Sequence, residues 1–427
     1  MSSLRPRHSE SVVRDALRWS RVVVINGPRQ AGKTTLSRII LAATAGRWVT
    51  FDSAQALGAC RADPAGFLEA YGTPLFIDEF QRAGDALVRA IKMKVDRDPA
   101  RGQYVLSGSS RFLTTAAISE SLAGRVRIVD LWPYTQGEAD ELGPEADTLL
   151  YRLFDESTPV MPGPPGTALG RAAYLERICR GGYPEVNDLP PQARRHWFDS
   201  YLRTVTQRDA PEIGRGRHLG ELPRLARILA ARTGQELIVD HVASEAGIDR
   251  TVLARNYLPL LETVYLSASL PAWSRNFTTR AIKHPKTYIA DPGLAAHLLG
   301  VNAAALAVPG SPALGPLVET FVVDELIRQA SRLLDPAVSL HHYRTKDQTE
   351  VDLIAEAADG RIVAIEVKAG RTVDRRTVRT LANLRDRADA MGARFVRGVV
   401  LHLGDEALPA GDRVSLLPLA HLWLPDG

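Results

Sequence analysis

A glycine-rich segment near the N-terminus constrains this chain more than any other feature. It reads Gly27-Pro28-Arg29-Gln30-Ala31-Gly32-Lys33-Thr34. An apolar, β-branched run at Arg21–Ile25 precedes it, and a helical pattern at Thr35–Ala43 follows. The glycines let successive backbone amides turn inward, and the start of a helix adds further donors and the positive end of its dipole. A loop of this kind between a strand and a helix binds the phosphates of a nucleotide, so the sequence predicts a P-loop.

Two side chains of this segment have direct chemical roles. Lys33 is expected to reach the β- and γ-phosphates, and the hydroxyl of Thr34 is expected to bind Mg²⁺. The other residues of the segment, together with Thr35, would place backbone amides around the phosphates. The sequence therefore predicts ATP and Mg²⁺ as ligands, with hydrolysis of the nucleotide.

The carboxylates of such a site follow a second apolar run, Leu75–Ile77. Parallel strands end at one edge of their sheet, so Asp78 is expected beside the magnesium ion. Glu79 is then placed to orient or deprotonate the attacking water. A third apolar run ends in Ser107, and Ser109 comes two residues later. We expect these hydroxyls near the γ-phosphate.

Arg125 closes the Ser121–Arg125 stretch and has two interpretations. It is an arginine finger on a phosphate, either within its own chain or in a neighbouring subunit, and the second case requires a homo-oligomer. Alternatively, it caps a helix end or pairs with a carboxylate.

The pattern along the chain indicates three parts. Apolar runs alternate with helical patterns in the first part, which is typical of a parallel α/β sheet. A stretch rich in proline and glycine, Thr158–Gly170, separates it from a mostly helical part. From about Gly315 a helix is followed by strands again. We expect an ATPase domain over 1–155, a helical and winged-helix region over 170–300 and a smaller α/β domain over 310–427.

Composition restricts the function only loosely. The chain of 427 residues has a net charge of +4, and 11 basic against 7 acidic residues lie between Arg215 and Asp291. Cys60 and Cys179 are far apart, which indicates neither a disulfide framework nor a zinc site. The polar N-terminus and the lack of an apolar run of about 18 residues favour a cytoplasmic protein without a membrane segment.

The middle part has the pattern of a winged helix. Helical stretches at 221–232 and 238–246 lead to a turn at Gly247 and a third helix capped by Asp249. Two strand-like stretches with cations between them follow, as in a wing. The residues expected to contact nucleic-acid phosphates are Arg250, Arg255, Arg275, Arg280, Lys283 and Lys286. The alternative is a module that docks proteins or serves as a lid.

Two predicted strands of the tail carry a second group of chemically active residues. Residues two apart in a strand face the same side, so Glu366 and Lys368 share a face. Asp352 lies in the other predicted strand, and if the two strands bring it beside Glu366, the two carboxylates can share a divalent metal, Mg²⁺ or Mn²⁺. Lys368 would then orient or activate a water against a phosphodiester.

Several segments, in order, resemble one known family. The resemblance is to the AAA+ ATPase domain of a bacterial and archaeal family, in which this domain precedes a region called DUF4143. The segments that are similar to it are GPRQAGKTTL, LFIDEFQ, VLSGSS and SLAGR. The resemblance continues at Gly181–Pro184, Lys286–Leu294 and Glu319–Val322. It implies a nucleotide-driven ATPase, in which a serine at Ser107 or Ser109 senses the γ-phosphate as polar residues do in AAA+ proteins.

The tail separately resembles the core of the PD-(D/E)xK nucleases. Asp352, Glu366 and Lys368 match that motif in order, and Glu319 matches an additional acidic residue that many members carry. The chain departs from the motif at Glu350, where proline is usual before the Val-Asp step. This departure leaves cleavage open, because Glu350 either adds a metal ligand or lies on the surface.

These features predict an α/β protein with a P-loop AAA+ ATPase head, a helical winged-helix middle and a PD-(D/E)xK-like tail. In the leading hypothesis it acts on nucleic acid, DNA before RNA, and the tail is a metal-dependent nuclease. In the competing hypothesis the chain is a regulatory ATP switch that binds protein partners and has an inactive tail.

Overall fold

A sheet of parallel strands carries the glycine-rich loop. The structure is a computed structural model and describes residues 5–108, 122–144, 146, 149–157, 169–214, 219–274, 283–332, 337–345, 349–390 and 392–424. The strand order is β2-β3-β4-β1-β5, and every neighbouring pair is parallel. The strands are β1 (Val22–Asn26), β2 (Arg47–Thr50), β3 (Leu75–Asp78), β4 (Tyr104–Gly108) and β5 (Val126–Asp130).

Both faces of β1 are buried, as its β-branched sequence predicts. Val22 and Val24 belong to one hydrophobic cluster, and Val23 and Ile25 belong to another. Because side chains alternate along a strand, these two clusters lie on opposite faces of the sheet. The sheet is therefore the middle of three layers, with both of its faces covered by other elements.

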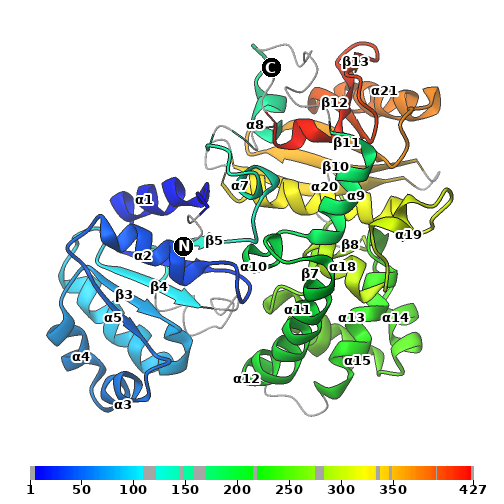
Figure 1. Cartoon of the computed structure of the whole chain (residues 1–427). Coiled ribbons are helices and arrows are strands. Elements are labelled where there is room, and N and C mark those ends of the chain that lie inside the picture. The colour runs from blue at the N-terminus through cyan, green and yellow to red at the C-terminus, as the bar shows by residue number, and fades with distance from the viewer. Residues whose placement is uncertain are drawn as a thin grey trace. The chain divides into compact units, whose positions relative to one another are not determined.

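Helices on the two faces complete this α/β unit (Figure 1). Val13 and Ile40, from the helices before and after the glycine-rich loop, pack in the cluster of Val23, whereas Phe67 and Ile91 pack in the cluster of Val22. The helices are α1 (Ser9–Trp19), α2 (Lys33–Ala42), α3 (Ala54–Ala62), α4 (Pro64–Tyr71) and α5 (Asp85–Arg97).

Most of the second unit before the tail is helical. Its elements are α7 (Gln136–Ala139), α8 (Leu149–Phe154), α9 (Arg171–Arg180), α10 (Pro184–Asn187), α11 (Pro191–Thr204), α12 (Ala210–Gly214), α13 (Leu222–Ala231), β6 (Gln235–Glu236), α14 (Val239–Ala246), α15 (Arg250–Val252), α16 (Leu258–Thr263), β7 (Ser267–Leu270), β8 (Lys286–Ile289), α18 (Pro292–Leu298) and α19 (Ala303–Ala307).

The segment expected to be a winged helix contains helices and a small sheet. Asp249 caps α15 as predicted, since its carboxylate accepts hydrogen bonds from the backbone amides of Thr251 at 2.8 Å and Val252 at 3.0 Å. A π-helical turn, Leu253–Tyr257, joins α15 to α16. The strands β6, β8 and β7 form an antiparallel sheet. The winged-helix assignment itself stays a prediction.

Two glycine-containing motifs that are far apart in the sequence pack together in this unit. Asp291 is fully buried, caps α18, and accepts a hydrogen bond from the Gly182 amide at 2.8 Å and one from Arg328 at 3.3 Å. A Cβ on Gly181 would lie 2.1 Å from its carboxylate, and one on Gly293 would lie 2.6 Å from the Arg180 carbonyl. Only glycine leaves room for this approach, which explains both motifs structurally.

The tail is a mixed sheet that packs against two long helices. The strand order is β13-β14-β12-β11-β10-β9, antiparallel from β9 to β11 and parallel from β11 through β12 to β14. The elements are α20 (Leu314–Ala330), β9 (Val338–Arg344), β10 (Glu350–Ala357), β11 (Arg361–Lys368), α21 (Arg375–Ala390), β12 (Arg394–His402), β13 (Leu408–Pro409) and β14 (Val414–Pro418).

The chain divides into units at a place other than the expected boundary. The first unit comprises residues up to Tyr134 with Thr263–Tyr265, and the second comprises Thr135–Glu262 with the rest of the chain. The segment from Thr135 to Phe154 therefore belongs with the second unit, although the sequence predicts a head that extends to residue 155. The division of the remainder at residues 300–310 stays a prediction.

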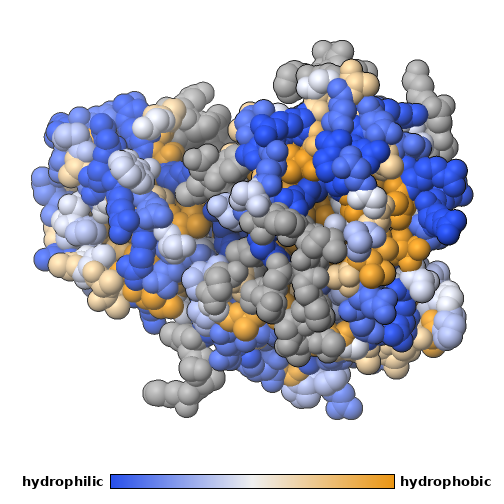
Figure 2. All heavy atoms as spheres, turned by 90° about the horizontal axis from the view of Figure 1, so that it is seen from above, coloured by the Kyte–Doolittle hydropathy of each residue, from blue (hydrophilic) through white to orange (hydrophobic). Residues whose placement is uncertain are grey.

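The surface is mainly polar. Hydrophilic residues cover most of the face in Figure 2, and apolar residues are visible in smaller groups. Large apolar side chains that are exposed in the described ranges include Trp19, Met93 and Tyr151. In the same ranges, no helix combines the length and apolar character needed to cross a bilayer.

The buried position of β4 leads to a stability prediction. Leu106 is fully buried, and Leu106→Ala is expected to lower the free energy of unfolding by about 2–5 kcal/mol, because it removes apolar contacts and leaves a cavity. Met93→Ala, at a side chain 58% exposed in the same unit, should change it by less than about 0.5 kcal/mol. Urea titration of the full chain measures both variants, and equal shifts would contradict the assignment of β4 to the core.

Candidate functional site

The backbone of the glycine-rich loop requires both of its terminal glycines. A Cβ on Gly27 would lie 2.1 Å from the carbonyl oxygen of Leu131, which no side chain tolerates. Gly32 has φ +92° at the N-cap of α2 and approaches the Arg7 guanidinium. Gln30 also has positive φ, at 62°. The loop between β1 and α2 therefore has the strongly curved backbone that a phosphate-binding loop needs.

Lys33 lies inside this curve. Its side chain is buried, and Nζ donates hydrogen bonds to the carbonyl oxygens of Gly27 at 2.8 Å and Pro28 at 2.7 Å. These contacts hold the ammonium at the loop, and its contact with phosphates stays a prediction. The remaining predicted contacts, Arg29, Gln30, Ala31 and Thr35, lie in the same loop or in the first turn of α2.

Asp78 joins three of the predicted residues. It accepts a hydrogen bond from Thr34 Oγ1 at 2.8 Å on one carboxylate oxygen and one from Ser107 Oγ at 2.6 Å on the other. Ser107 is its register partner, because β3 and β4 are neighbours in the sheet. A threonine hydroxyl and a carboxylate are hard oxygen ligands, so Thr34 and Asp78 fit a magnesium ion that also contacts phosphate oxygens.

Glu79 follows in an uncommon backbone conformation. Its φ is +54°, a left-handed value that non-glycine residues adopt mainly at turns and functional sites. Gln81 Nε2 donates a hydrogen bond to its carboxylate at 2.5 Å. Burial raises the pKa of Glu79 above its ordinary value, although Lys33 acts in the opposite direction. A carboxylate with a raised pKa beside the magnesium ligands is suited to accept a proton.

Two further predictions for this unit have different outcomes. Ser109 lies outside the described residues. Arg125 forms an ion pair with Asp96 in α5, and its Nη1 donates a hydrogen bond to the Ala123 carbonyl at 2.9 Å. The alternative of pairing with a carboxylate therefore describes Arg125 in this chain, and the arginine-finger role stays a prediction.

Sequence reasoning missed Arg7. Its Nη1 donates a hydrogen bond to the carbonyl of Ala31 at 2.5 Å, Nη2 donates one to the carbonyl of Trp132 at 2.7 Å, and the guanidinium lies 4.9 Å from the centre of the Tyr134 ring. Arg7 thus connects the P-loop to the segment after β5. A lone arginine in a polar N-terminal segment gives no signal of such a role, because the contact spans more than a hundred residues.

In the tail, the structure brings the predicted nuclease-like residues together. The backbone amide of Val367 donates a hydrogen bond to Asp352 at 2.8 Å, and the amide of Asp352 donates one to Glu366 at 3.4 Å. Lys368 Nζ donates a hydrogen bond to Glu366 at 2.6 Å. Glu319, in α20, joins the same cluster through the ammonium of Lys286, a residue that was predicted to contact nucleic acid from a wing.

The position of Lys286 corrects the prediction of an exposed wing contact. The side chain is 2% exposed, and Nζ lies 2.7 Å from Glu350, 2.9 Å from Glu319 and 3.5 Å from Asp352. The physical reason is that β8 is buried along its whole length between β6 and β7, so its side chains do not reach solvent. A buried ammonium requires acidic partners, and these three carboxylates supply them.

The other predicted nucleic-acid contacts differ in their surroundings. Arg250 pairs with Asp240 at 2.6 Å, where both side chains are exposed. Arg255 is exposed, and Lys283 Nζ donates a hydrogen bond to the Arg344 carbonyl at 3.0 Å. Arg275 and Arg280 lie outside the described residues.

Charges in the carboxylate cluster of Glu319, Glu350, Asp352 and Glu366 perturb one another. Burial, followed by the nearby charge of Asp352, raises the pKa of Glu319 and of Glu366 to about 7. Burial by itself would lower the pKa of Lys286, but the surrounding carboxylates raise it above its ordinary value. Lys286 is therefore charged at neutral pH.

As arranged, this cluster does not fit a divalent metal. Its oxygens are engaged by Lys286, by Lys368, by the Val367 amide and by the hydroxyl of Tyr288, which donates to Glu319 at 2.7 Å. Among the residues described, no three acidic, histidine or cysteine side chains are grouped so that they could hold a metal ion. The predicted shared metal thus has no open ligand set here.

A cleft of about 620 Å³ opens beside Glu366 and Lys368. Its lining includes Lys368, Arg376, Arg379, Thr349, Thr380 and Asn383. Arg376 and Arg379 are exposed on the first turns of α21. The hydrogen bond from the Thr377 amide and the nearby charge of Arg376 help to lower the pKa of Asp374, which lines the same cleft with Glu350. The arginine-rich start of this helix is the sequence signal that would have indicated the cleft.

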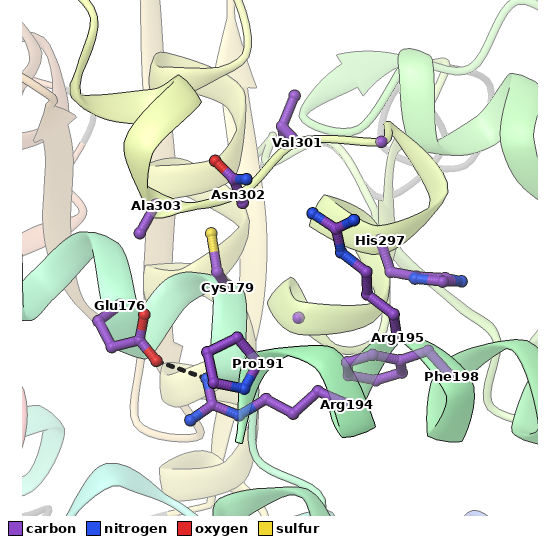
Figure 3. Close-up of a pocket in the computed structure, with 12 residues that line it drawn as sticks. Glu176, Cys179, Pro191, Arg194, Arg195, Phe198, His297, Val301, Asn302 and Ala303 are labelled. Atoms are coloured by element: carbon purple, nitrogen blue, oxygen red, sulfur yellow. Dashed lines mark hydrogen bonds and ion pairs between the residues drawn. The ribbon is translucent and has the colours of Figure 1, made fainter. Parts of the chain in front are cut away.

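A separate pocket of about 270 Å³ lies among α9, α11 and α18 (Figure 3). The Arg194 guanidinium points toward Glu176 and pairs with it at 2.5 Å, while the His297 ring stacks on Phe198. Burial raises the pKa of Cys179 in its lining to about 12, so this thiol is protonated at neutral pH. The pocket therefore contains no ready nucleophile.

Three known families match three successive segments of the chain. Residues 20–139 match the family described as AAA domain, residues 171–305 match DUF8612, and residues 314–422 match DUF4143, the last two being domains of unknown function. The resemblance to DUF4143 is thus confirmed for the tail, while the middle matches a different family. The AAA match covers the P-loop, Asp78 at the end of β3 and Glu79 directly after it.

Solved structures show weaker similarity. The Walker-type ATPase PABY2304 of Pyrococcus abyssi is 14% identical, with a TM-score of 0.42, over 70% of this chain and 96% of that one. RuvB, the Holliday junction branch migration motor of Thermotoga maritima, is 18% identical, with a TM-score of 0.31, over 62% of this chain and 90% of that one.

Two curated relatives align over nearly the whole chain. They are the uncharacterized proteins Rv2008c of Mycobacterium tuberculosis and Mb2031c of Mycobacterium bovis. Each is 30% identical over 414 residues, which is 96% of this chain and 83% of the relative. With its P-loop geometry and its AAA domain match, the chain belongs to the family of these two mycobacterial proteins and carries an AAA-type ATPase domain.

Proposed function

We propose that this protein is a magnesium-dependent ATP hydrolase that acts on nucleic acid, which its second unit binds along the phosphodiester backbone. The observation that carries the hydrolase is the contact of Thr34 and Ser107 with the two oxygens of Asp78, next to the P-loop lysine. The nucleic-acid part rests on the cleft beside Lys368, whose lining includes Arg376 and Arg379 as well as the acidic residues Glu350, Glu366 and Asp374.

The residues of the first unit have separate tasks in hydrolysis. The loop amides and Lys33 hold the phosphates, and Thr34 with Asp78 holds the magnesium ion. Magnesium, when bound, neutralises charge on the phosphate oxygens. Glu79 orients the attacking water and accepts its proton, and Gln81 fixes the direction of that carboxylate.

The cleft beside Lys368 supports a phosphodiester ligand. Arg376 and Arg379 are exposed along it, and threonine and asparagine side chains between them offer neutral hydrogen-bond donors. Cations combined with neutral donors are the groups that contact phosphates in nucleic-acid complexes. The exposed Arg255 of the middle segment adds a second, predicted contact.

For the tail we favour binding without cutting. Metal-dependent cleavage needs carboxylate oxygens that are open to a metal ion, whereas Glu319 and Asp352 face the Lys286 ammonium. The juxtaposition of Asp352, Glu366 and Lys368 favours the nuclease as the second candidate. Incubation of the protein with DNA and a divalent metal distinguishes the two.

Lys33→Ala should lower ATP turnover by about 10²–10³-fold and weaken ATP binding, because it removes a preorganised cation from the phosphates. Glu79→Gln should lower turnover by a similar factor while ATP stays bound, because the amide cannot accept the proton. Phosphate release and ATP retention on a filter measure the two effects. Lys94→Ala, at an exposed ion pair with Glu69, is the matched control and should keep wild-type turnover. Normal turnover in Lys33→Ala would contradict the assigned site.

Replacing both Arg376 and Arg379 by alanine should weaken DNA binding and reduce the slope of log K against log salt by about 0.7–0.9 for each phosphate that is no longer bound. Arg387→Ala, an exposed arginine of α21 outside the cleft, is the control and should have a much smaller effect. Fluorescence anisotropy with single- and double-stranded oligonucleotides at several salt concentrations measures this. If Arg255→Ala alone abolishes binding and the double variant does not, the middle segment is the contact.

Supercoiled plasmid and short single-stranded DNA should remain intact when incubated with the wild-type protein and Mg²⁺ or Mn²⁺. The reason is that the Lys286 ammonium occupies the carboxylates a metal would need. Gel electrophoresis follows the substrate over time. Cutting by wild type that disappears in the variant carrying both Asp352→Ala and Lys368→Ala would establish the nuclease instead. Cutting that persists in that variant would indicate a contaminant.

A further inference from the structure

We propose that the ammonium of Lys286 is a built-in cation that takes the place of a divalent metal in the tail, and that removing it turns the carboxylate cluster into a divalent-metal site. This inference goes beyond the proposed function, because it concerns which cation the carboxylates hold and does not require that the chain bind nucleic acid.

The first support is the geometry around Nζ. The atom lies 2.7 Å from Glu350, 2.9 Å from Glu319 and 3.5 Å from Asp352. Glu319 lies in α20, whereas Glu350 and Asp352 lie in β10, so the ammonium connects two elements of the tail to β8. Carboxylates that converge from different elements on one point are also how proteins bind hard divalent cations.

The anchoring of β8 keeps the ammonium there. Lys286 pairs with Leu270 on one neighbouring strand and with Glu236 on the other. Tyr288, two residues further along β8, faces the same side and donates a hydrogen bond to the same Glu319 oxygen at 2.7 Å. Two side chains of a strand that is paired on both edges therefore contact the same Glu319 oxygen, and the Lys286 side chain itself is 2% exposed.

The charge balance explains why removal of Lys286 should create a metal site. The cluster has four carboxylates, Glu319, Glu350, Asp352 and Glu366, and two ammonium groups. Lys368 pairs with Glu366 at 2.6 Å, so Lys286 is the cation that contacts the other three. Without it, three carboxylates would face one another in a largely buried space. Oxygen ligands of this kind prefer Mg²⁺, Ca²⁺ or Mn²⁺.

Binding of Mn²⁺ to the nucleotide-free full chain tests the proposal. Asp78→Asn is included in every protein, so that the first unit loses its metal-binding carboxylate. Titration followed by electron paramagnetic resonance should find no Mn²⁺ site in this background protein. Adding Lys286→Met, which keeps the length of the side chain and removes its charge, should create one site per chain. Adding Asp352→Asn to that variant should weaken Mn²⁺ binding at least tenfold.

Thermal unfolding with and without Mn²⁺ gives a second readout. Mn²⁺ should raise the melting temperature of the Lys286→Met protein and leave that of the background protein unchanged, because a ligand stabilises only the folded state that binds it. Lys286→Gln, which keeps a polar end group, is the second variant if methionine prevents folding.

Two results would overturn the proposal. One is a Mn²⁺ site in the background protein that disappears when Asp352→Asn is added, since the wild-type cluster would then hold metal despite Lys286. The other is a folded Lys286→Met or Lys286→Gln protein that binds no Mn²⁺. Neither result bears on whether the protein hydrolyses ATP or binds DNA, so failure here is distinguishable from failure of the proposed function.

Discussion

A charge that leaves water needs a partner inside the protein, and both candidate sites of this chain are built around that requirement. In the first unit, Lys33 is buried against two carbonyl oxygens of its own loop, and Asp78 accepts hydrogen bonds from two hydroxyls. In the second unit, three carboxylates surround Lys286. Because an unpaired buried charge costs several kcal/mol, each group fixes the positions of its partners.

The two sites use this requirement differently. In the P-loop Lys33 donates hydrogen bonds to two neutral carbonyls of its own loop, and its charge also acts on the Glu79 carboxylate, where it opposes the rise in pKa that burial causes. In the tail the partners of Lys286 are charged, so its positive charge is already balanced. A lysine next to open space attracts an anionic ligand, whereas a lysine enclosed by carboxylates excludes a cationic one. This contrast is why we assign catalysis to the first unit and backbone binding to the second.

The cleft beside Lys368 connects the tail to the proposed ligand. Glu366 and Lys368 of the PD-(D/E)xK-like set line this cleft, together with Arg376 and Arg379 of α21. We propose that such a tail binds a phosphodiester in this cleft, while Glu319, Glu350 and Asp352 hold the Lys286 ammonium. The relatives Rv2008c and Mb2031c align with 96% of this chain.

Local sequence by itself determined the P-loop, the positions of Asp78 and Ser107 at the ends of their strands, and the helix cap at Asp249. Each depends on neighbours within a few residues, where backbone geometry and side-chain alternation apply directly. Side-chain alternation also placed Glu366 and Lys368 on one face of their strand, whereas the expectation that Asp352 lies beside them came from the resemblance to the PD-(D/E)xK core.

Only the tertiary structure decided the role of Lys286, the contact of Arg7 with the P-loop and the position of the unit boundary. Lys286 is more than 30 residues from each of its acidic partners, and Arg7 contacts residues 24 and 125 positions away. A basic residue between two apolar stretches has the same local pattern whether it faces solvent or a buried carboxylate. The choice depends on which distant elements pack beside it, and that information is not local.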